Sequence, residues 1–88
     1  MRRRPIVPAE PDIQGARRLL ARNVHSLRKA AELTQLEASE RGGLDIRLWQ
    51  KVEYEDTNAT LATLVRVATG LDVGIAELFK PCRSRSCT

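Results

Sequence analysis

Apolar residues recur along much of the chain at the three- and four-residue steps that place side chains on one face of an α-helix. The first such series is Leu20, Val24, Leu27 and Ala31. Asp12 precedes it as a candidate N-cap, so the sequence predicts a first helix over about residues 13–31. Gly15 weakens the first turn, which favours a start nearer Ala16.

A second, short helix is predicted over residues 35–41. Thr34 and Glu37 form a T-x-x-E capping box, in which each side chain accepts a hydrogen bond from a free backbone amide of the other residue. Gly42 and Gly43 then end the helix, because helix ends often need a left-handed residue that glycine adopts without steric cost.

The third segment is open to two interpretations. Asp45 is suited to cap a helix over about residues 45–53, with Leu48, Trp49 and Val52 on its inner face. Ile46, Leu48, Val52 and Tyr54 also stand at even spacing, which suits a strand. The cap, and the lack of another alternating run to pair with, favour the helix.

The fourth helix is predicted to begin after Thr60 and to end with Gly70 at the position after its C-cap. Its apolar stripe is Leu61, Leu64, Val65 and Ala68. A last short helix carries Ile75, Leu78 and Phe79, and Pro81 stops it. The fold class is therefore all-α, a compact five-helix bundle over residues 16–81. We expect a flexible, basic and proline-rich arm at 1–15 and a disordered tail at 82–88.

Composition limits the class of protein. The 88 residues suffice for one small domain, and the longest apolar run has three residues, too short to span a membrane. A signal peptide is not expected, because three prolines interrupt residues 1–11, and we expect a cytoplasmic protein. The net charge of +4 comes from the two ends of the chain, so it fits nucleic-acid binding and basic solubilising tails equally well.

Metal and catalytic sites find little support in the sequence. His25 is the single histidine and is expected on the surface, while Cys82 and Cys87 stand in the tail and are expected to be free thiols. These are too few ligands for a zinc finger. No nucleophile stands beside a base, and no glycine-rich phosphate loop is present, so we expect neither an enzyme nor a cofactor.

The second and third helices, joined by a glycine turn, have the arrangement of a helix-turn-helix at about residues 35–53. If the inner face of the third helix is buried, four residues lie on its outer face: Ile46, Arg47, Gln50 and Lys51. A helix of this kind fits the major groove, where Arg47 can bind guanine through two hydrogen bonds and Gln50 can bind adenine. The alternative is an ordinary charged surface.

Two longer motifs carry a family resemblance. Residues 23–44 read N-V-x-x-L-R-K-x-x-x-L-T-Q-x-E-x-S-E-R-x-G-L, and residues 58–79 read N-x-T-L-x-T-L-V-R-V-A-x-x-L-x-V-x-x-x-E-L-F. With the V-E at 52–53 between them, they resemble the phage-repressor type (Cro/cI, Xre) helix-turn-helix family, which implies a lambda-repressor-like bundle.

The resemblance implies roles for individual residues. The base-reading positions of the family fall on Asp45, Ile46, Arg47 and Lys51. Its phosphate-contacting positions fall on Gln35, Tyr54, Thr57 and Asn58. An ion pair that links the first helix to the end of the third falls on Arg28 and Glu53, and we expect that pair to be structural.

The sequence also departs from the family pattern. Ala38 stands where leucine is usual, and Trp49 stands where a smaller aliphatic is usual, an exchange of volume that a core tolerates. Glu55 and Asp56 replace small or basic residues and place carboxylates near the expected phosphates, which weakens DNA binding.

We therefore expect a small prokaryotic or phage transcription regulator that binds double-stranded DNA as a homodimer on a two-fold site. The exposed edge around Ile75, Leu78 and Phe79 is a candidate interface, although these residues also suit the core. Arg2 to Arg4 are candidate minor-groove contacts. The alternative function is a protein-interaction module of the same fold, such as an antitoxin-like partner subunit with weak or no DNA binding.

Overall fold

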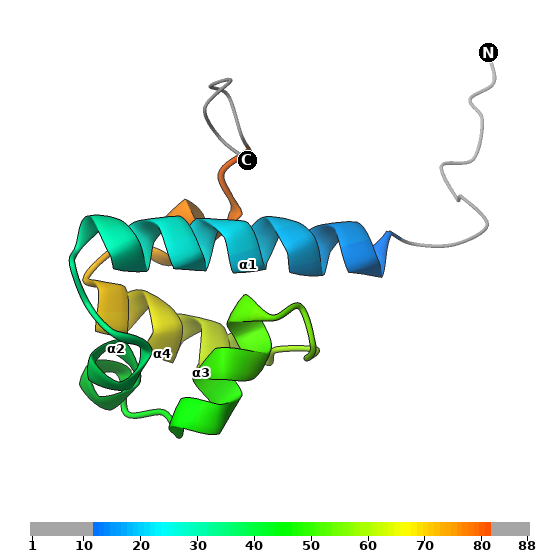
Figure 1. Ribbon diagram of the computed structural model, residues 1–88. Helices are drawn as coiled ribbons and strands as arrows, with labels where there is room; N and C mark the ends of the chain where they lie inside the picture. Colours follow the sequence, from blue (N-terminus) through cyan, green and yellow to red (C-terminus); the bar gives the residue numbers. More distant parts are fainter. Residues whose placement is uncertain (1–11, 82–88) are drawn as a thin grey trace, which may run out of the picture.

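The computed structural model of the protein describes residues 12–81, and in this part of the chain it contains helices and no strand. The elements are α1 (Ile13–Ala30), α2 (Gln35–Gly42), α3 (Ile46–Glu53), α4 (Leu61–Leu71) and a final 3₁₀-helix, η1 (Ile75–Phe79). The long α1 lies across the three shorter α-helices (Figure 1). The all-helical prediction is confirmed, and the third segment is a helix.

The last element differs from the predicted fifth α-helix. Residues 75–79 form a 3₁₀-helix, with the amide of Glu77 donating to the carbonyl of Gly74 at 3.0 Å. It has no side-chain cap, and Pro81 lacks the amide that a further turn would need. Such a short segment therefore forms the tighter 3₁₀ turns.

Side-chain caps begin all four α-helices. Asp12, Thr34, Asp45 and Thr60 each accept a hydrogen bond from a backbone amide two or three residues later. The capping box of Thr34 and Glu37 is confirmed, with distances of 2.8 and 3.0 Å. The helical part begins at Ile13 rather than at residue 16, because the Asp12 cap compensates for Gly15.

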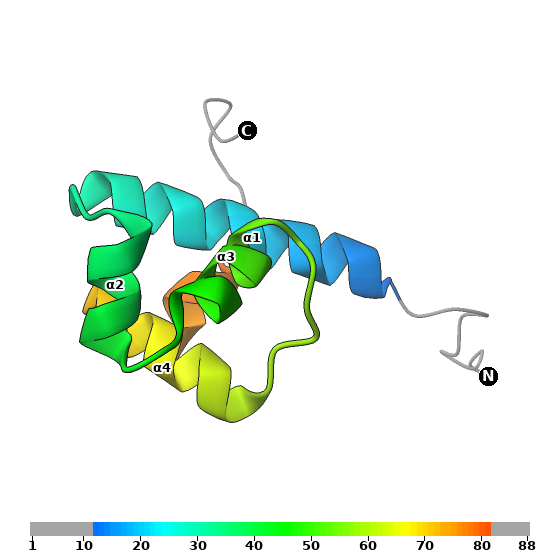
Figure 2. The same ribbon diagram turned by 60° about the horizontal axis from the view of Figure 1, so that its bottom comes forward.

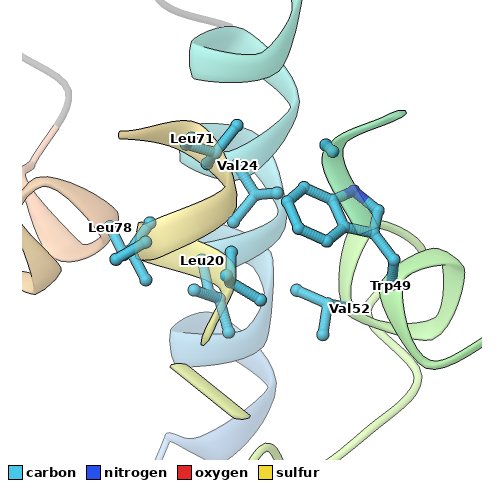
Figure 3. Close-up of a cluster of buried hydrophobic side chains, with 9 residues drawn as sticks. Leu20, Val24, Trp49, Val52, Leu71 and Leu78 are labelled. Atoms are coloured by element: carbon cyan, nitrogen blue, oxygen red, sulfur yellow. The ribbon is translucent and has the colours of Figure 1, made fainter. Parts of the chain in front are cut away.

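The core is aliphatic around one aromatic side chain. Trp49 of α3 is fully buried and packs with Leu20 and Val24 of α1, Leu71 of α4 and Leu78 of η1 (Figure 3). Ala38, also fully buried, lies in the same cluster. The large indole of Trp49 thus compensates for the small side chain of Ala38, as the sequence predicted.

Two glycines let α2 and α4 approach closely. A Cβ on Gly70 would lie 2.4 Å from the carbonyl oxygen of Ala38, and one on Gly42 would lie 2.3 Å from the carbonyl oxygen of Arg66. Gly70 is therefore an interior helix residue and not the left-handed residue that ends α4. Asp72 takes the left-handed conformation instead, with φ of 59°.

The inner face of α4 also differs from the prediction. Val67, Ala68 and Leu71 are buried, whereas Leu61 and Val65 are 70% and 50% exposed. Leu78 is fully buried in the core, which removes it from the candidate dimer interface.

No helix in the described part of the chain is long and apolar enough to cross a membrane. The expectations for the arginines at 2–4, for Cys82 and Cys87, and for the tail at 82–88 concern residues outside the described range.

Candidate nucleic-acid interface

The exposed side of α3 carries the predicted base-reading residues. Trp49 and Val52 are buried under the helix, while Arg47 and Lys51 are exposed and Ile46 and Gln50 are partly exposed. Leu48, predicted to face the core, is only partly buried. The two cations therefore stand on the side of α3 that faces away from the core.

Asp45 holds the beginning of this helix. Its Oδ1 accepts a hydrogen bond of 2.7 Å from the backbone amide of Arg47. The carboxylate thus satisfies a free amide at the helix start and fixes where the Arg47 side chain leaves the backbone.

Gln50 and Gln35 are joined across the turn between α2 and α3. Nε2 of Gln50 donates to Oε1 of Gln35 at 3.3 Å, and Nε2 of Gln35 donates to Oε1 of Glu53 at 3.2 Å. The sequence assigned the two glutamines separate roles, in base and phosphate contact. The structure connects them to each other and to the end of α3.

Glu53 is the centre of a polar network that joins three helices. Its side chain is 3% exposed, and Arg28 of α1 binds it through two hydrogen bonds of 2.7 and 3.1 Å. Nε1 of Trp49 donates to Oε2 at 2.6 Å, and Nδ1 of His25 lies 3.2 Å from Oε1. The Arg28–Glu53 pair therefore fixes the C-terminal end of α3 against α1.

The carboxyl of Glu53 is held in its ionised form. Burial raises its pKa, but the hydrogen bonds from Arg28, Trp49 and the other donors together lower it by more. The pKa of Glu53 therefore lies below its ordinary value of 4.5.

Sequence reasoning missed two members of this network. His25 was expected to be a plain surface residue, and it is exposed but also contacts Glu53. Trp49 was assigned a packing role alone. The spacing of four residues between Trp49 and Glu53 was the available signal, since such pairs are neighbours on a helix. His25 comes from another helix, so only the fold brings it to Glu53.

The segment from α3 to α4 first runs along α1 and then returns to α4 (Figure 2). Tyr54, which follows α3, is 65% exposed. Asn58 accepts a hydrogen bond from Arg17 of α1, and Thr57 lines a hollow with Ile13 and Phe79. Among the described residues no hydrogen bond joins Thr57 or Asn58 to α3.

The two acidic residues of this segment have different surroundings. Oε1 of Glu55 accepts a hydrogen bond of 3.2 Å from Gln14 of α1, and Glu55 is partly buried. Asp56 is exposed. One of the two carboxylates expected to repel phosphates is therefore turned toward α1.

Residues 12–81 contain no group of three or more histidine, cysteine, aspartate or glutamate side chains arranged to hold a metal ion.

Comparison with known proteins gives no match to any family model and no match among curated proteins. Solved structures do match. A hypothetical transcription factor, NHTF from Neisseria, is 33% identical with a TM-score of 0.72, over 85% of this chain and 87% of that one. The restriction-modification controller protein C.AhdI from Aeromonas hydrophila is 29% identical with a TM-score of 0.70, over 74% of this chain and 98% of that one.

A third structure shares the fold at lower identity. An HTH_3 family transcriptional regulator from Vibrio cholerae is 22% identical with a TM-score of 0.73, over 76% of this chain and 38% of that one. The class that these structures define is that of helix-turn-helix transcription regulators. This chain belongs to the phage-repressor type of this class, the Cro/cI (Xre) family, as its motifs predicted.

Proposed function

We propose that the protein is a transcription regulator that binds double-stranded DNA sequence-specifically, with α3 in the major groove. The observation that supports this most is the division of α3 into two sides. Trp49 and Val52 anchor one side in the core, and Arg47 and Lys51 stand exposed on the other. A helix with side chains fits a groove about 12 Å wide.

Each outward residue has a suitable partner on the bases. The planar guanidinium of Arg47 binds O6 and N7 of guanine together, a contact worth about 1–3 kcal/mol of discrimination. Lys51 reaches guanine or a phosphate, and Gln50 reads adenine while Gln35 holds its amide in place. Ile46 packs on a thymine methyl group, and Asp45 both caps the helix and stands at the base edge.

Phosphate contacts flank the base contacts. Gln35 and the exposed Tyr54 stand at the beginning of α2 and the end of α3, next to the reading residues. Thr57 and Asn58 belong to the segment before α4, where the free amides at a helix start attract phosphate. In this proposal, Arg28 and Glu53 position α3 and do not contact DNA.

The regulator is proposed to act as a symmetric homodimer. One eight-residue helix contacts few bases, and two linked half-sites about one helical turn apart multiply affinity. Among the exposed apolar side chains of residues 12–81, those of the C-terminal half that are available for an interface are Leu61 and Val65 of α4 and Ile75 and Phe79 of η1. Sedimentation equilibrium checks this proposal. If the protein has the mass of a monomer at the concentrations at which it binds DNA, the proposal is contradicted.

Selection of bound duplexes from a random pool, followed by binding measurements on the selected site, tests the function. Arg47→Ala is expected to lower affinity for the selected site by about 1–3 kcal/mol and to relax preference at one base pair. Lys80→Ala is a matched control, because Lys80 is an exposed cation paired with Glu77 in η1 and should leave the site preference unchanged.

The same experiment separates the alternative function. If the wild-type protein has no affinity for duplex DNA even at low salt, the regulator proposal fails and a protein-interaction module of the same fold is favoured. Glu55 supports that alternative less than its sequence position suggested, because its carboxylate is hydrogen-bonded to Gln14.

A further inference from the structure

A row of basic side chains runs along one face of α1. Its members are Arg18, Arg22, His25 and Lys29, at steps of four, three and four residues. This spacing places side chains above one another on a helix. Arg18 and Lys29 are exposed, Arg22 is partly exposed, and the His25 side chain is 57% exposed. We call this set the α1 basic row.

The cations of the α1 basic row are not used to hold the fold together. Within residues 12–81, no ion pair and no side-chain hydrogen bond involves Arg18, Arg22 or Lys29. Arg17 and Arg28, their neighbours on α1, do bind other elements. Arg18, Arg22 and Lys29 are therefore available to a ligand, whereas His25 lies against Glu53.

The row borders the end of α3. Arg18, Arg22 and His25 line a hollow of about 320 Å³ together with Glu53 and Glu55. Arg28 balances the charge of Glu53. The carboxylate of Glu55, which accepts a hydrogen bond from the neutral Gln14, is therefore the one negative charge set against the guanidinium groups of Arg18 and Arg22 in the hollow. The hollow is thus suited to an anion.

A short path connects the row to the base-reading side of α3. It runs from Gln50 to Gln35 at 3.3 Å, from Gln35 to Glu53 at 3.2 Å, and from Glu53 to His25 at 3.2 Å. The row thus adjoins the C-terminal end of α3 through Glu53, and the edges of the groove that α3 is proposed to enter are made of phosphates.

We propose that the α1 basic row binds phosphates of the DNA strand at one rim of the groove occupied by α3. The proposal rests on the proposed function and extends it, because it assigns phosphate contacts to Arg18 and Arg22, on a helix that lies outside the helix-turn-helix. These contacts position the protein on any sequence and carry no base information. The ligand class is the phosphodiester backbone of duplex DNA.

Salt dependence of binding tests the proposal. Affinity of the full chain for the selected duplex and for an unrelated duplex is measured between 50 and 200 mM salt, for wild type and for Arg18→Gln with Arg22→Gln. Each lost phosphate contact reduces the slope of log affinity against log salt by about 0.9, so loss of two contacts reduces it by about 1.8. Affinity should fall equally on both duplexes.

Two further variants make the result specific. Arg18→Lys with Arg22→Lys keeps both charges and should keep the wild-type slope. Arg66→Gln with Lys80→Gln removes two exposed cations from α4 and the end of η1, and should leave the slope unchanged. Far-ultraviolet circular dichroism and thermal unfolding should be unchanged for the Arg18 and Arg22 variants, since these side chains lie at the surface. The control loses the 3.4 Å hydrogen bond from Arg66 to the carbonyl of Gly42 and the pair of Lys80 with Glu77, so its unfolding is measured to show that it is folded at the temperature of the binding assay.

The outcomes are distinguishable. A wild-type slope for Arg18→Gln with Arg22→Gln, while Arg47→Ala still loses site preference, overturns the inference and leaves the regulator proposal intact. An equal loss of slope in the Arg66 and Lys80 control shows a general charge effect and also overturns it. Absence of DNA binding by the wild type overturns both proposals.

Discussion

Nε1 of Trp49 donates a hydrogen bond of 2.6 Å to Oε2 of Glu53, one turn later on the same helix. The indole ring is fully buried in the apolar core, whereas its N–H reaches the polar network that binds α3 to α1. One side chain therefore fills the space beside Ala38 and orients the carboxylate that fixes the end of α3.

Glu53→Gln should strongly destabilise the protein. The substitution leaves the guanidinium of Arg28, whose side chain is 10% exposed, without an anionic partner. Breaking one side of a buried pair costs about 3–5 kcal/mol. The free energy of unfolding from urea titration checks this. Glu77→Gln is the control, because it breaks a more exposed pair with Lys80 and should cost less than about 1 kcal/mol.

Stability should fall in acid through the same residue. The pKa of Glu53 is lower in the folded protein than its ordinary value of 4.5, so its contribution is present at neutral pH and decreases as the pH falls below that value toward the folded pKa. Urea unfolding at pH 7 and pH 3 measures the decrease. Glu53→Gln, which cannot titrate, should show a smaller difference between the two pH values; an equal difference would contradict the assignment.

Gly70→Ala should separate α2 from α4. The new methyl group would lie 2.4 Å from the carbonyl oxygen of Ala38 and 3.3 Å from Cζ3 of Trp49, so one helix must move. Such overpacking costs about 1–3 kcal/mol. Gly74→Ala is the matched control, since nothing lies within 4 Å of its Cβ position and its φ of −76° suits alanine. Equal thermal midpoints for the two variants would refute this explanation of Gly70.

Glu55→Gly should stabilise the protein by about 1 kcal/mol. Glu55 has φ of 63°, a left-handed conformation that costs an L-residue about 1–2 kcal/mol and costs glycine little. Loss of the exposed hydrogen bond from Gln14 offsets part of the gain. Glu55→Ala removes the same carboxylate without relieving the backbone and should give no gain. If alanine and glycine stabilise equally, charge and not backbone conformation is responsible.

Local signals predicted the elements of the fold well. The capping box at Thr34 and Glu37 fixes the start of α2, and the cap at Asp45 favours a helix over a strand for α3. Both were predictable because each cap binds a backbone amide only two or three residues away in the sequence. The exchange of volume between Ala38 and Trp49 was also predictable, since the family pattern shows one position too small and another too large.

Features that depend on contacts between distant segments were not predictable. Gly70 had the sequence context of a helix end, but its role depends on the backbone of α2, more than 25 residues earlier in the chain. Leu61 and Val65 fitted the inner stripe of α4, but the neighbouring helices cover Val67 and Leu71 instead. The contact of Glu55 with Gln14 spans 41 residues, and no local pattern indicates it.

The residue that fixes α3 to the rest of the fold is distinct from the exposed cations on its outer side. The carboxylate of Glu53 ties down its last residue, whereas the cations of Arg47 and Lys51 make no ion pair with any other residue in the range 12–81. Replacing Arg47 or Lys51 with another residue should therefore leave the stability of the fold unchanged. Under the proposed function, substitutions at these two positions would change which bases are read without a compensating change in the scaffold.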